Sequence, residues 1–212
     1  MLFSQNGEKC IFIHIPKTGG NTIQKALLDL GESFDEIKVS GHQDGKDRFE
    51  IRGTYTTKKH MRVAEYLKHE DLLSLNIFSC VRRPLQRLVS LYFSPHRHIQ
   101  KDVCKGDWHI PSEVQFDIDE FKSLIDKTPT CLDMLSIKLN NGLSAIPTKI
   151  KIMRTENLKD DCKRILGLDI LRSSNVSPYR IEASLACERR DVISLVGSSR
   201  HAQDETFFYS SS

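Results

Sequence analysis

Short apolar runs alternate with helical repeats along the chain. Residues 9–15 (KCIFIHI) and 76–81 (NIFSCV) are nearly continuous in apolar character, which is typical of strands buried on both faces of a sheet. A third strand is predicted over residues 149–153. After the first strand, residues 22–30 (TIQKALLDL) carry apolar side chains at helical spacing, and Gly31 is a natural stop.

Helical patterns follow the other strands as well. Pro84 opens a helix directly after the second strand, because a proline at the first helical position gives up no hydrogen bond. The remaining elements are predicted as helices over 61–67, 117–127 and 158–166, the last ended by Gly167, and as loops over 41–48 and 94–116. This alternation predicts an α/β domain with a mainly parallel central sheet flanked by helices. The length of 212 residues favours a single domain over residues 1–212.

The composition is that of a packed globular domain, with 39% apolar and 28% charged residues. The net charge of +3 is mild, so we expect no nucleic-acid partner, which requires a strongly basic surface. No apolar run reaches the roughly 18 residues of a membrane span, and the first residues lack the pattern of a signal peptide. We therefore expect no membrane span, and either a cytoplasmic protein or a trimmed Golgi-lumenal domain.

Six cysteines are spread along the chain without a CxxC pair. Cys10 and Cys80 lie in strand-like apolar runs. The spacing argues against a zinc site, and the length argues against a small disulfide-stapled protein. Reduced, mostly structural thiols and no metal are therefore expected.

The stretch HIPKTGGNT, residues 14–22, follows the first predicted strand. In parallel sheets, ligands bind beyond the carboxyl ends of the strands. Glycines let the backbone approach a ligand, and the next helix N-terminus supplies N–H groups with a partial positive charge. Lys17 adds a full charge, and Thr18 and Thr22 add hydroxyl groups. The pattern predicts a P-loop-like site for an anion of phosphate or sulfate size, with a purely structural tight turn as the alternative.

This loop differs from that of the nucleoside triphosphatases. Their pattern is GxxxxGK[ST], with the lysine after the glycines, whereas Lys17 precedes Gly19 and Gly20. The chain also lacks a convincing magnesium-holding aspartate at the end of a following strand. A P-loop kinase is therefore the less favoured enzyme hypothesis.

A second candidate anion site lies in VRRPLQRLVSLY, residues 81–92. Arg82 stands at the strand end, where a planar guanidinium suits two parallel hydrogen bonds to a phosphate. Ser90 comes eight residues later, about two helical turns on. In the alternative interpretation, Arg82 and Arg87 are surface or ion-pairing residues and Ser90 is an ordinary helix serine. Two anion sites at neighbouring strand ends favour a nucleotide with both 5′ and 3′ anions.

The order of these motifs resembles a known family. HIPKTGGNT, then FSCVRRPLQRLVSLYF, and then IMRTENLKDDCKRILGL over residues 152–168 resemble the sulfotransferases that use 3′-phosphoadenosine 5′-phosphosulfate (PAPS). The resemblance is closest to the carbohydrate-type branch that includes the heparan sulfate 2-O-sulfotransferases. It implies sulfuryl transfer from PAPS, without a metal, to a hydroxyl acceptor on a carbohydrate.

The resemblance also implies which residues bind the donor. It assigns the 5′-phosphosulfate to Lys17, Thr18, Gly19, Gly20, Asn21 and Thr22, and the 3′-phosphate to Arg82 and Ser90. It further implies that residues 175–180 close over the nucleotide. Where the family often has Arg-Asp-Pro, this chain has Arg82-Arg83-Pro84, so the contact made by that aspartate is not carried over.

Sulfuryl transfer to a hydroxyl needs a base, and histidine suits neutral pH. Lys17 would neutralise charge on the leaving nucleotide. We choose His60 as the base, because it precedes a predicted helix and its position 22 residues before Arg82 resembles the catalytic-histidine region of the 2-O-sulfotransferases. In the alternative interpretation His60 is an exposed histidine in a basic turn, and the base is His42 or Glu65.

The acceptor side is less defined by the sequence. His96 and His98 stand in a predicted loop that could line an acceptor cleft, and Lys58, Lys59 and Arg62 could attract an anionic glycan. The second functional hypothesis is a non-catalytic nucleotide- or glycan-binding module on the same fold. Donor binding without transfer to any acceptor would favour that hypothesis.

Overall fold

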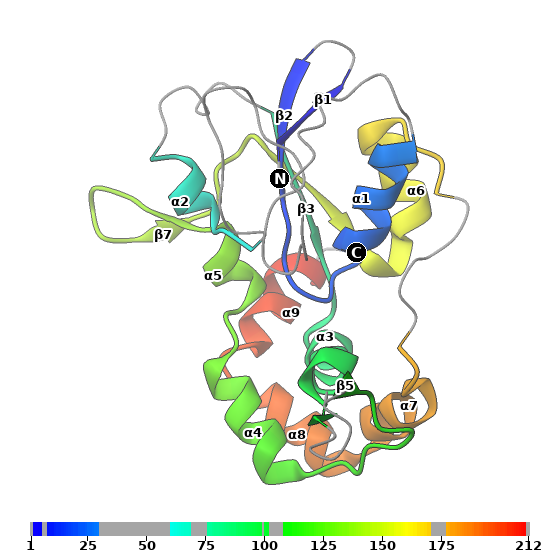
Figure 1. Cartoon of the computed structure of the whole chain (residues 1–212). Coiled ribbons are helices and arrows are strands. Elements are labelled where there is room, and N and C mark those ends of the chain that lie inside the picture. The colour runs from blue at the N-terminus through cyan, green and yellow to red at the C-terminus, as the bar shows by residue number, and fades with distance from the viewer. Residues whose placement is uncertain are drawn as a thin grey trace. The chain divides into compact units, whose positions relative to one another are not determined.

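A computed structural model describes residues 2–5, 8–29, 60–68, 76–98, 100–101, 108–170 and 177–210. The chain divides into two compact units, each built from two stretches (Figure 1). We call Met1–Val81 with Cys131–Ser174 the sheet unit, and Arg82–Thr130 with Asn175–Ser212 the helical unit. The single domain expected over residues 1–212 stays a prediction.

The sheet unit is built around four strands in the order β1-β2-β3-β8. Their bounds are Leu2–Gln5 for β1, Glu8–Ile13 for β2, Asn76–Val81 for β3 and Ile150–Arg154 for β8. β2, β3 and β8 run parallel, with Ile13 opposite Ser79 and Val81 opposite Arg154, while β1 pairs with β2 in the antiparallel direction. The α/β class with a mainly parallel sheet is confirmed, and β1 is a strand that the sequence pattern did not predict.

Two helices pack against this sheet, α1 (Gly20–Asp29) and α6 (Leu158–Leu166), on the same side of the strands in Figure 1. Ile23 of α1 and Leu166 of α6 share one buried cluster with Phe12 and Phe78 of the strands. Gly167 ends α6 with a left-handed φ of 65°, as its position in the sequence predicts. The cluster holds the carboxyl end of β2 and the start of α1 in a defined place.

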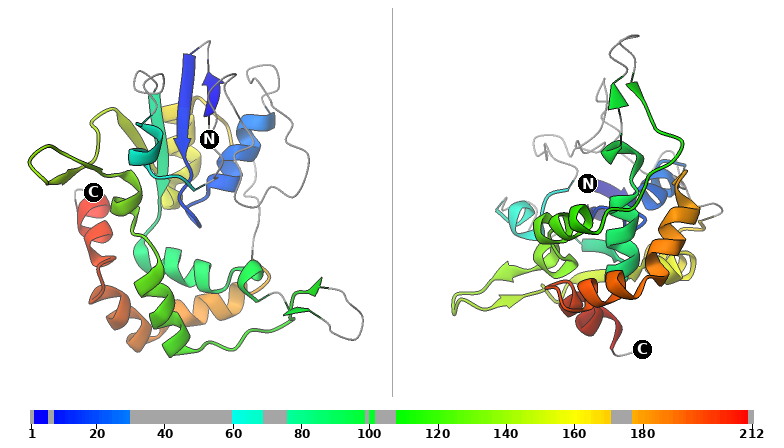
Figure 2. Two further views of the ribbon diagram at one scale, coloured as in Figure 1. Left: turned by 60° about the vertical axis from the view of Figure 1, so that its left-hand side comes forward. Right: turned by 90° about the horizontal axis from the view of Figure 1, so that it is seen from below.

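The remaining elements of the sheet unit are short. They are α2 (Val63–Tyr66), α5 (Cys131–Leu135), the paired strands β6 (Ile137–Lys138) and β7 (Ser144–Ala145), and the 3₁₀ helix η3 (Thr155–Asn157). Both views of Figure 2 show the β6–β7 hairpin projecting from the rest of this unit. The helix expected over residues 61–67 is thus present in shorter form, whereas α5 and the hairpin were not predicted.

The helical unit contains α3 (Pro84–Tyr92), α4 (Ile118–Lys127), α7 (Arg180–Glu188), α8 (Arg190–Gly197) and α9 (Ala202–Tyr209). α3 starts at Pro84 as predicted, and the Asp117 side chain caps α4 by accepting hydrogen bonds from the N–H groups of Asp119 and Glu120. The segment expected as a loop over 94–116 holds the 3₁₀ helix η2 (Pro95–Arg97) and an antiparallel pair, β4 (Gln100–Lys101) and β5 (Trp108–His109).

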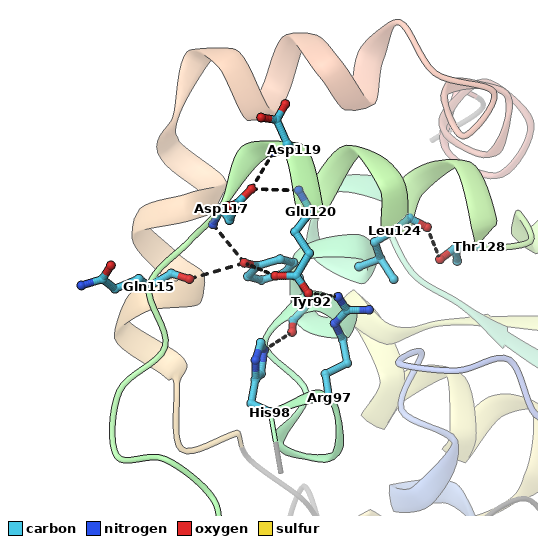
Figure 3. Close-up of polar contacts among 9 residues, drawn as sticks. All are labelled: Tyr92, Arg97, His98, Gln115, Asp117, Asp119, Glu120, Leu124 and Thr128. Atoms are coloured by element: carbon cyan, nitrogen blue, oxygen red, sulfur yellow. Dashed lines mark hydrogen bonds and ion pairs between the residues drawn. The ribbon is translucent and has the colours of Figure 1, made fainter. Parts of the chain in front are cut away.

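Tyr92, the last residue of α3, lies in the aromatic core of the helical unit (Figure 3). Its hydroxyl accepts a hydrogen bond from the Asp117 N–H at 2.9 Å and lies 3.1 Å from Oε2 of Glu120 and 3.4 Å from the Gln115 carbonyl. Burial raises the pKa of Tyr92, so the hydroxyl keeps the proton that it donates to these acceptors. The ring packs against Phe116 among others. These contacts fix the end of α3.

None of the five described cysteines forms a disulfide, and Cys104 lies outside the described residues. Burial raises the pKa of Cys10 to about 11 and that of Cys162 to about 12. Both thiols are therefore protonated at neutral pH. This state agrees with the expectation of reduced, structural cysteines.

No helix among the described residues is both long and apolar enough to cross a membrane. No group of three or more His, Cys, Asp or Glu side chains in the same part of the chain is placed to hold a metal ion.

Candidate functional site

The loop between β2 and α1 turns sharply at the carboxyl end of its strand. It spans residues 14–19, and two of these have left-handed backbone, Lys17 at φ 66° and Gly19 at φ 86°. Glycine adopts this conformation without steric cost, whereas for lysine it costs about 1 kcal/mol. Strained non-glycine residues persist where surrounding contacts hold them, and they cluster at ligand-binding sites. Lys17 therefore marks this turn as a candidate site.

Gly19 of this loop and Gly20 at the start of α1 both lie close to other side chains. A Cβ atom on Gly20 would lie 2.2 Å from Cδ2 of His14, so the imidazole packs directly on the Gly20 backbone. A Cβ atom on Gly19 would lie 3.0 Å from Cδ2 of Leu158 in α6. Packing thus requires glycine at position 20, and the left-handed backbone favours it at position 19.

Two hydroxyl groups hold the loop. Thr18 is buried, and its Oγ1 donates a hydrogen bond to the Ile15 carbonyl at 2.9 Å. Thr155, the first residue after β8, places its Oγ1 2.8 Å from the Thr18 carbonyl and 2.9 Å from the Val81 carbonyl. The Thr18 hydroxyl, expected to face an anion, is therefore bonded within the loop, and Thr18 would offer a ligand its backbone N–H. Thr155 was not among the residues predicted for the site, and its signal in the sequence is its place in RTEN, directly after the third predicted strand.

The first turn of α1 continues the candidate site. The helix starts at Gly20, and the Gly19 carbonyl accepts hydrogen bonds from the N–H groups of Thr22 at 3.0 Å and Ile23 at 3.2 Å. Asn21 is half-buried and Thr22 is buried. This first turn carries no acidic residue, so nothing in it offsets the partial positive charge of the helix end. Such a helix N-terminus favours an anion.

His60 lies beside the same strand end. Its Nδ1 is 2.8 Å from the carbonyl oxygen of His14, and the two imidazole rings meet edge to face with centroids 4.8 Å apart. Because a carbonyl only accepts, Nδ1 carries the proton, and Nε2 of the neutral ring is left as the acceptor. His60 is exposed, whereas His14 is buried. The residue predicted as the base is thus bonded to the first residue of the loop, with a defined tautomer.

The alternative bases are placed differently. Oε2 of Glu65 accepts a hydrogen bond from the Arg62 N–H at 2.8 Å, which ties this carboxylate to the start of α2. Arg62 itself is exposed. His42, Lys58 and Lys59 lie outside the described residues.

The second candidate segment begins where β3 ends. Arg82 follows Val81 directly and precedes α3, which carries Ser90, and both Arg82 and Ser90 are half-buried. Burial raises the pKa of the Cys187 thiol in α7, and the nearby positive charge of Arg82 partly offsets this rise. Both Arg82 and Ser90 belong to the helical unit.

Two further arginines of this segment have structural contacts. Arg87 is buried, and its Nη1 donates a hydrogen bond to the Pro129 carbonyl at 3.0 Å. Arg83 pairs with Glu205, and its Cζ lies 4.6 Å from the ring centroid of Tyr209. The alternative interpretation of a structural arginine therefore describes Arg87. The assignment of Arg82 to an anion stays a prediction.

The late segment expected to close over the nucleotide is attached to the end of α3. The Ser177 hydroxyl donates a hydrogen bond to the Phe93 carbonyl at 3.0 Å, and the buried Tyr179 donates one to the Pro111 carbonyl at 2.7 Å. Residues 175–176 lie outside the described ranges. The described part of this segment, 177–180, is thereby bonded to Phe93, which follows Ser90 by three residues.

The histidines expected to line an acceptor cleft are only partly described. Nε2 of His98 donates a hydrogen bond to the Tyr92 carbonyl at 2.7 Å (Figure 3), and its ring packs edge to face on Tyr179. His98 therefore belongs to the aromatic core of the helical unit. The side chain of His96 lies outside what the structure describes.

Comparison with known proteins gives the family. The chain matches the Sulfotransferase family over residues 2–203, a range that includes the β2–α1 loop, His60 and α3. No curated protein and no solved structure matches the chain significantly. Because the family match covers nearly the whole sequence, the chain belongs to the sulfotransferase family, whose members transfer sulfuryl groups.

Proposed function

We propose that this sulfotransferase moves the sulfuryl group of PAPS to a hydroxyl group of a carbohydrate, by in-line transfer with His60 as the base. The observation that carries the proposal is the loop after β2. There, the left-handed Lys17 and two glycines stand at a helix N-terminus, and His60 is bonded to the loop's first residue. This transfer requires a site for the anionic donor and a basic nitrogen close to it, and the loop and His60 are proposed for these two roles.

The 5′-phosphosulfate is assigned to the β2–α1 loop. Gly19 and Gly20 keep the backbone free of side-chain bulk, and Lys17 supplies a full positive charge. The close packing of His14 on Gly20 supports this fit, because it holds the start of α1 in one place. Asn21 and Thr22 in the first helical turn and the backbone of Thr18 complete the proposed set.

The 3′-phosphate is assigned to Arg82 and Ser90. A half-buried guanidinium is screened less by salt than an exposed one, so its hydrogen bonds to phosphate oxygens are stronger. The resemblance of VRRPLQRLVSLY to the family motif supports the same assignment.

The proposed reaction moves one proton and exchanges one bond. Nε2 of His60 takes the proton of the acceptor hydroxyl while that oxygen attacks sulfur. A new S–O bond forms as the bond between sulfur and the bridging phosphate oxygen breaks, and the electron pair stays on the nucleotide. Lys17 offsets the negative charge that develops there.

A carbohydrate acceptor is proposed from the resemblance to the heparan sulfate 2-O-sulfotransferases. Positive charge near the base supports it: Arg62 is exposed two residues after His60, and Lys58 and Lys59 precede His60. Such charge raises the local concentration of an anionic glycan.

The test is a calorimetric comparison of 3′-phosphoadenosine 5′-phosphate with adenosine 5′-phosphate, which lacks the 3′-phosphate. We expect the wild type to prefer the bisphosphate and Arg82→Ala to lose that preference, by about tenfold to a hundredfold. Lys17→Ala should weaken both nucleotides alike. Arg83→Ala is the matched control, because the neighbouring guanidinium pairs with Glu205.

Each alternative hypothesis predicts a different experimental result. Equal affinity of the wild type for both nucleotides would contradict the 3′-phosphate site. Tight nucleotide binding without transfer of labelled sulfate to any glycan would support the non-catalytic module. Magnesium-dependent ATP turnover would support the kinase hypothesis.

A further inference from the structure

Thr155 connects the ends of all three parallel strands. It follows β8 directly and begins η3. Its Oγ1 lies 2.8 Å from the Thr18 carbonyl, 2.9 Å from the Val81 carbonyl and 3.5 Å from Sγ of Cys80. One side chain at the end of β8 thus joins the loop after β2 to the last residue of β3.

The hydrogens at this junction can be assigned from the chemistry of the groups. A hydroxyl has one proton, and carbonyls only accept, so Thr155 shares its proton between the Thr18 and Val81 carbonyls. Burial raises the pKa of the Cys80 thiol, which therefore keeps its proton and can donate it to Oγ1 of Thr155. The hydroxyl is thus held by three neighbours at once.

The bond to Thr18 determines how the next peptide is oriented. A trans peptide is planar, so its C=O and N–H groups point in opposite directions. Because the Thr18 carbonyl points toward Thr155, the Gly19 N–H points to the opposite side of that peptide. This peptide joins Thr18 to the left-handed Gly19, one residue after the left-handed Lys17, and leads into the start of α1.

The methyl group of Thr155 contacts the same part of the loop. A Cβ atom on Gly19 would lie 3.8 Å from Cγ2 of Thr155 and 3.0 Å from Cδ2 of Leu158. The hydroxyl therefore orients the loop, while the methyl packs beside it. Serine keeps the first group and valine keeps the second, so substitution separates the two contributions.

We propose that Thr155 is a positioning residue for the donor. Its hydroxyl holds the Thr18–Gly19 peptide so that the Gly19 N–H faces the 5′-phosphosulfate. Thr155 acts through the loop and does not touch the substrate. The inference rests on the proposed function, since it assigns the orienting of the donor to this residue.

The experiment measures the affinity for 3′-phosphoadenosine 5′-phosphate in Thr155→Val, Thr155→Ser and Thr128→Val. Thr128 is the matched control, because its Oγ1 donates a hydrogen bond to the Leu124 carbonyl at 2.7 Å in the helical unit (Figure 3). We expect Thr155→Val to bind about tenfold more weakly than the wild type, the effect of losing one such bond. Thr155→Ser and Thr128→Val should bind like the wild type. Thermal unfolding of each variant separates affinity from stability.

Unchanged affinity in Thr155→Val would overturn the inference, and so would equal weakening in Thr155→Ser. The residual dipolar coupling of the Gly19 N–H reports the orientation of this peptide without any ligand. If the wild type bound no nucleotide, the proposed function would fail. A Gly19 coupling that changes in Thr155→Val but not in Thr155→Ser or Thr128→Val would then still support the orienting role, and an unchanged coupling would overturn it.

Discussion

The segments that follow β2 and β3 begin at neighbouring parallel strands but are built differently. After β2, residues 14–19 separate the strand from its helix and include two left-handed residues, Lys17 and Gly19. After β3, only Arg82 and Arg83 precede α3, which starts at Pro84. The first segment is shaped by backbone packing and by hydrogen bonds to carbonyls. The second segment consists of two charged side chains.

This difference indicates what each segment tolerates. We expect the first to be sensitive to an added Cβ atom and to the loss of a hydroxyl that holds a carbonyl, because the proposed donor site needs N–H groups in one orientation. We expect the second to be sensitive to the loss of a guanidinium and to salt, because salt screens the proposed contact between Arg82 and a phosphate. Substitutions in the first segment should therefore change stability and turnover, whereas substitutions in the second should change nucleotide affinity and its salt dependence.

The largest expected effect comes from His60, which is bonded to the first residue of the β2–α1 loop. In His60→Ala, we expect turnover to fall about a hundredfold to ten-thousandfold, the usual contribution of a general base. Nucleotide affinity should stay close to that of the wild type, because the proposed role of the side chain is toward the acceptor. Single-turnover transfer at saturating PAPS and a nucleotide titration measure the two quantities. Normal turnover in this variant would remove His60 from the mechanism and leave the first segment as a binding site.

An added methyl group at Gly20 should have the next largest effect. The new Cβ would lie 2.2 Å from the His14 ring, and relieving this overlap should lower the free energy of unfolding by about 1–3 kcal/mol. Displacing His14 also moves the carbonyl that holds His60, so turnover should fall as well. Urea denaturation and the transfer assay measure these effects.

The matched control for Gly20 is Gly197→Ala at the end of α8, where no atom of the described residues, apart from the chain neighbours and the helix's own backbone, lies within 4 Å of the added Cβ. This change should be neutral or stabilising by up to about 1 kcal/mol. If the Gly20 and Gly197 variants were equally stable, the first segment would not depend on close backbone packing.

The smallest expected effect concerns the pH dependence of the helical unit, which contains the second segment. His201 is buried, and its Nε2 donates a hydrogen bond to the Ile125 carbonyl at 3.2 Å. Burial lowers the pKa of His201, the hydrogen bond to Ile125 opposes this, the charges of Arg87 and Arg200 lower it further, and Asp204 raises it.

Because the folded pKa of His201 is lowered, the unfolded chain binds the proton more readily. Stability should therefore be fully present above the ordinary histidine pKa of about 6.5 and should decline as the pH falls through it, by at most about 1.4 kcal/mol per pH unit. His201→Gln should reduce this slope. Urea denaturation above and below that pH, in both proteins, measures the difference. Identical slopes would show that His201 does not link the stability of this unit to pH.

Much of the framework that holds the loop was predictable from the sequence. The apolar runs at 9–15 and 76–81 correspond to β2 and β3. A strand that is buried on both faces carries apolar residues at successive positions, and this gives a run that can be recognised in the sequence. Pro84 and Gly167 gave helix boundaries through their backbone chemistry. The glycine-rich loop was also predicted from backbone chemistry, because few residues other than glycine fit such a turn.

Other features have no local sequence signal. β1 and the β6–β7 hairpin are too short to show periodicity, and the division into two units depends on tertiary contacts. The bonds from Thr155 to Thr18 and from His60 to the His14 carbonyl join segments far apart in the chain. Because their acceptors are backbone groups, no side-chain pattern reveals these partners.

The position of β8 in the chain has a consequence for biosynthesis. β8 pairs with β3 but follows it only after the whole 82–130 stretch of the helical unit. β3 therefore leaves the ribosome long before β8, the strand that pairs with this edge of β3. Until residues 150–154 emerge, that side of β3 exposes unpaired N–H and C=O groups, which can pair with other chains. The yield of folded protein should thus depend on how quickly translation passes from β3 to β8.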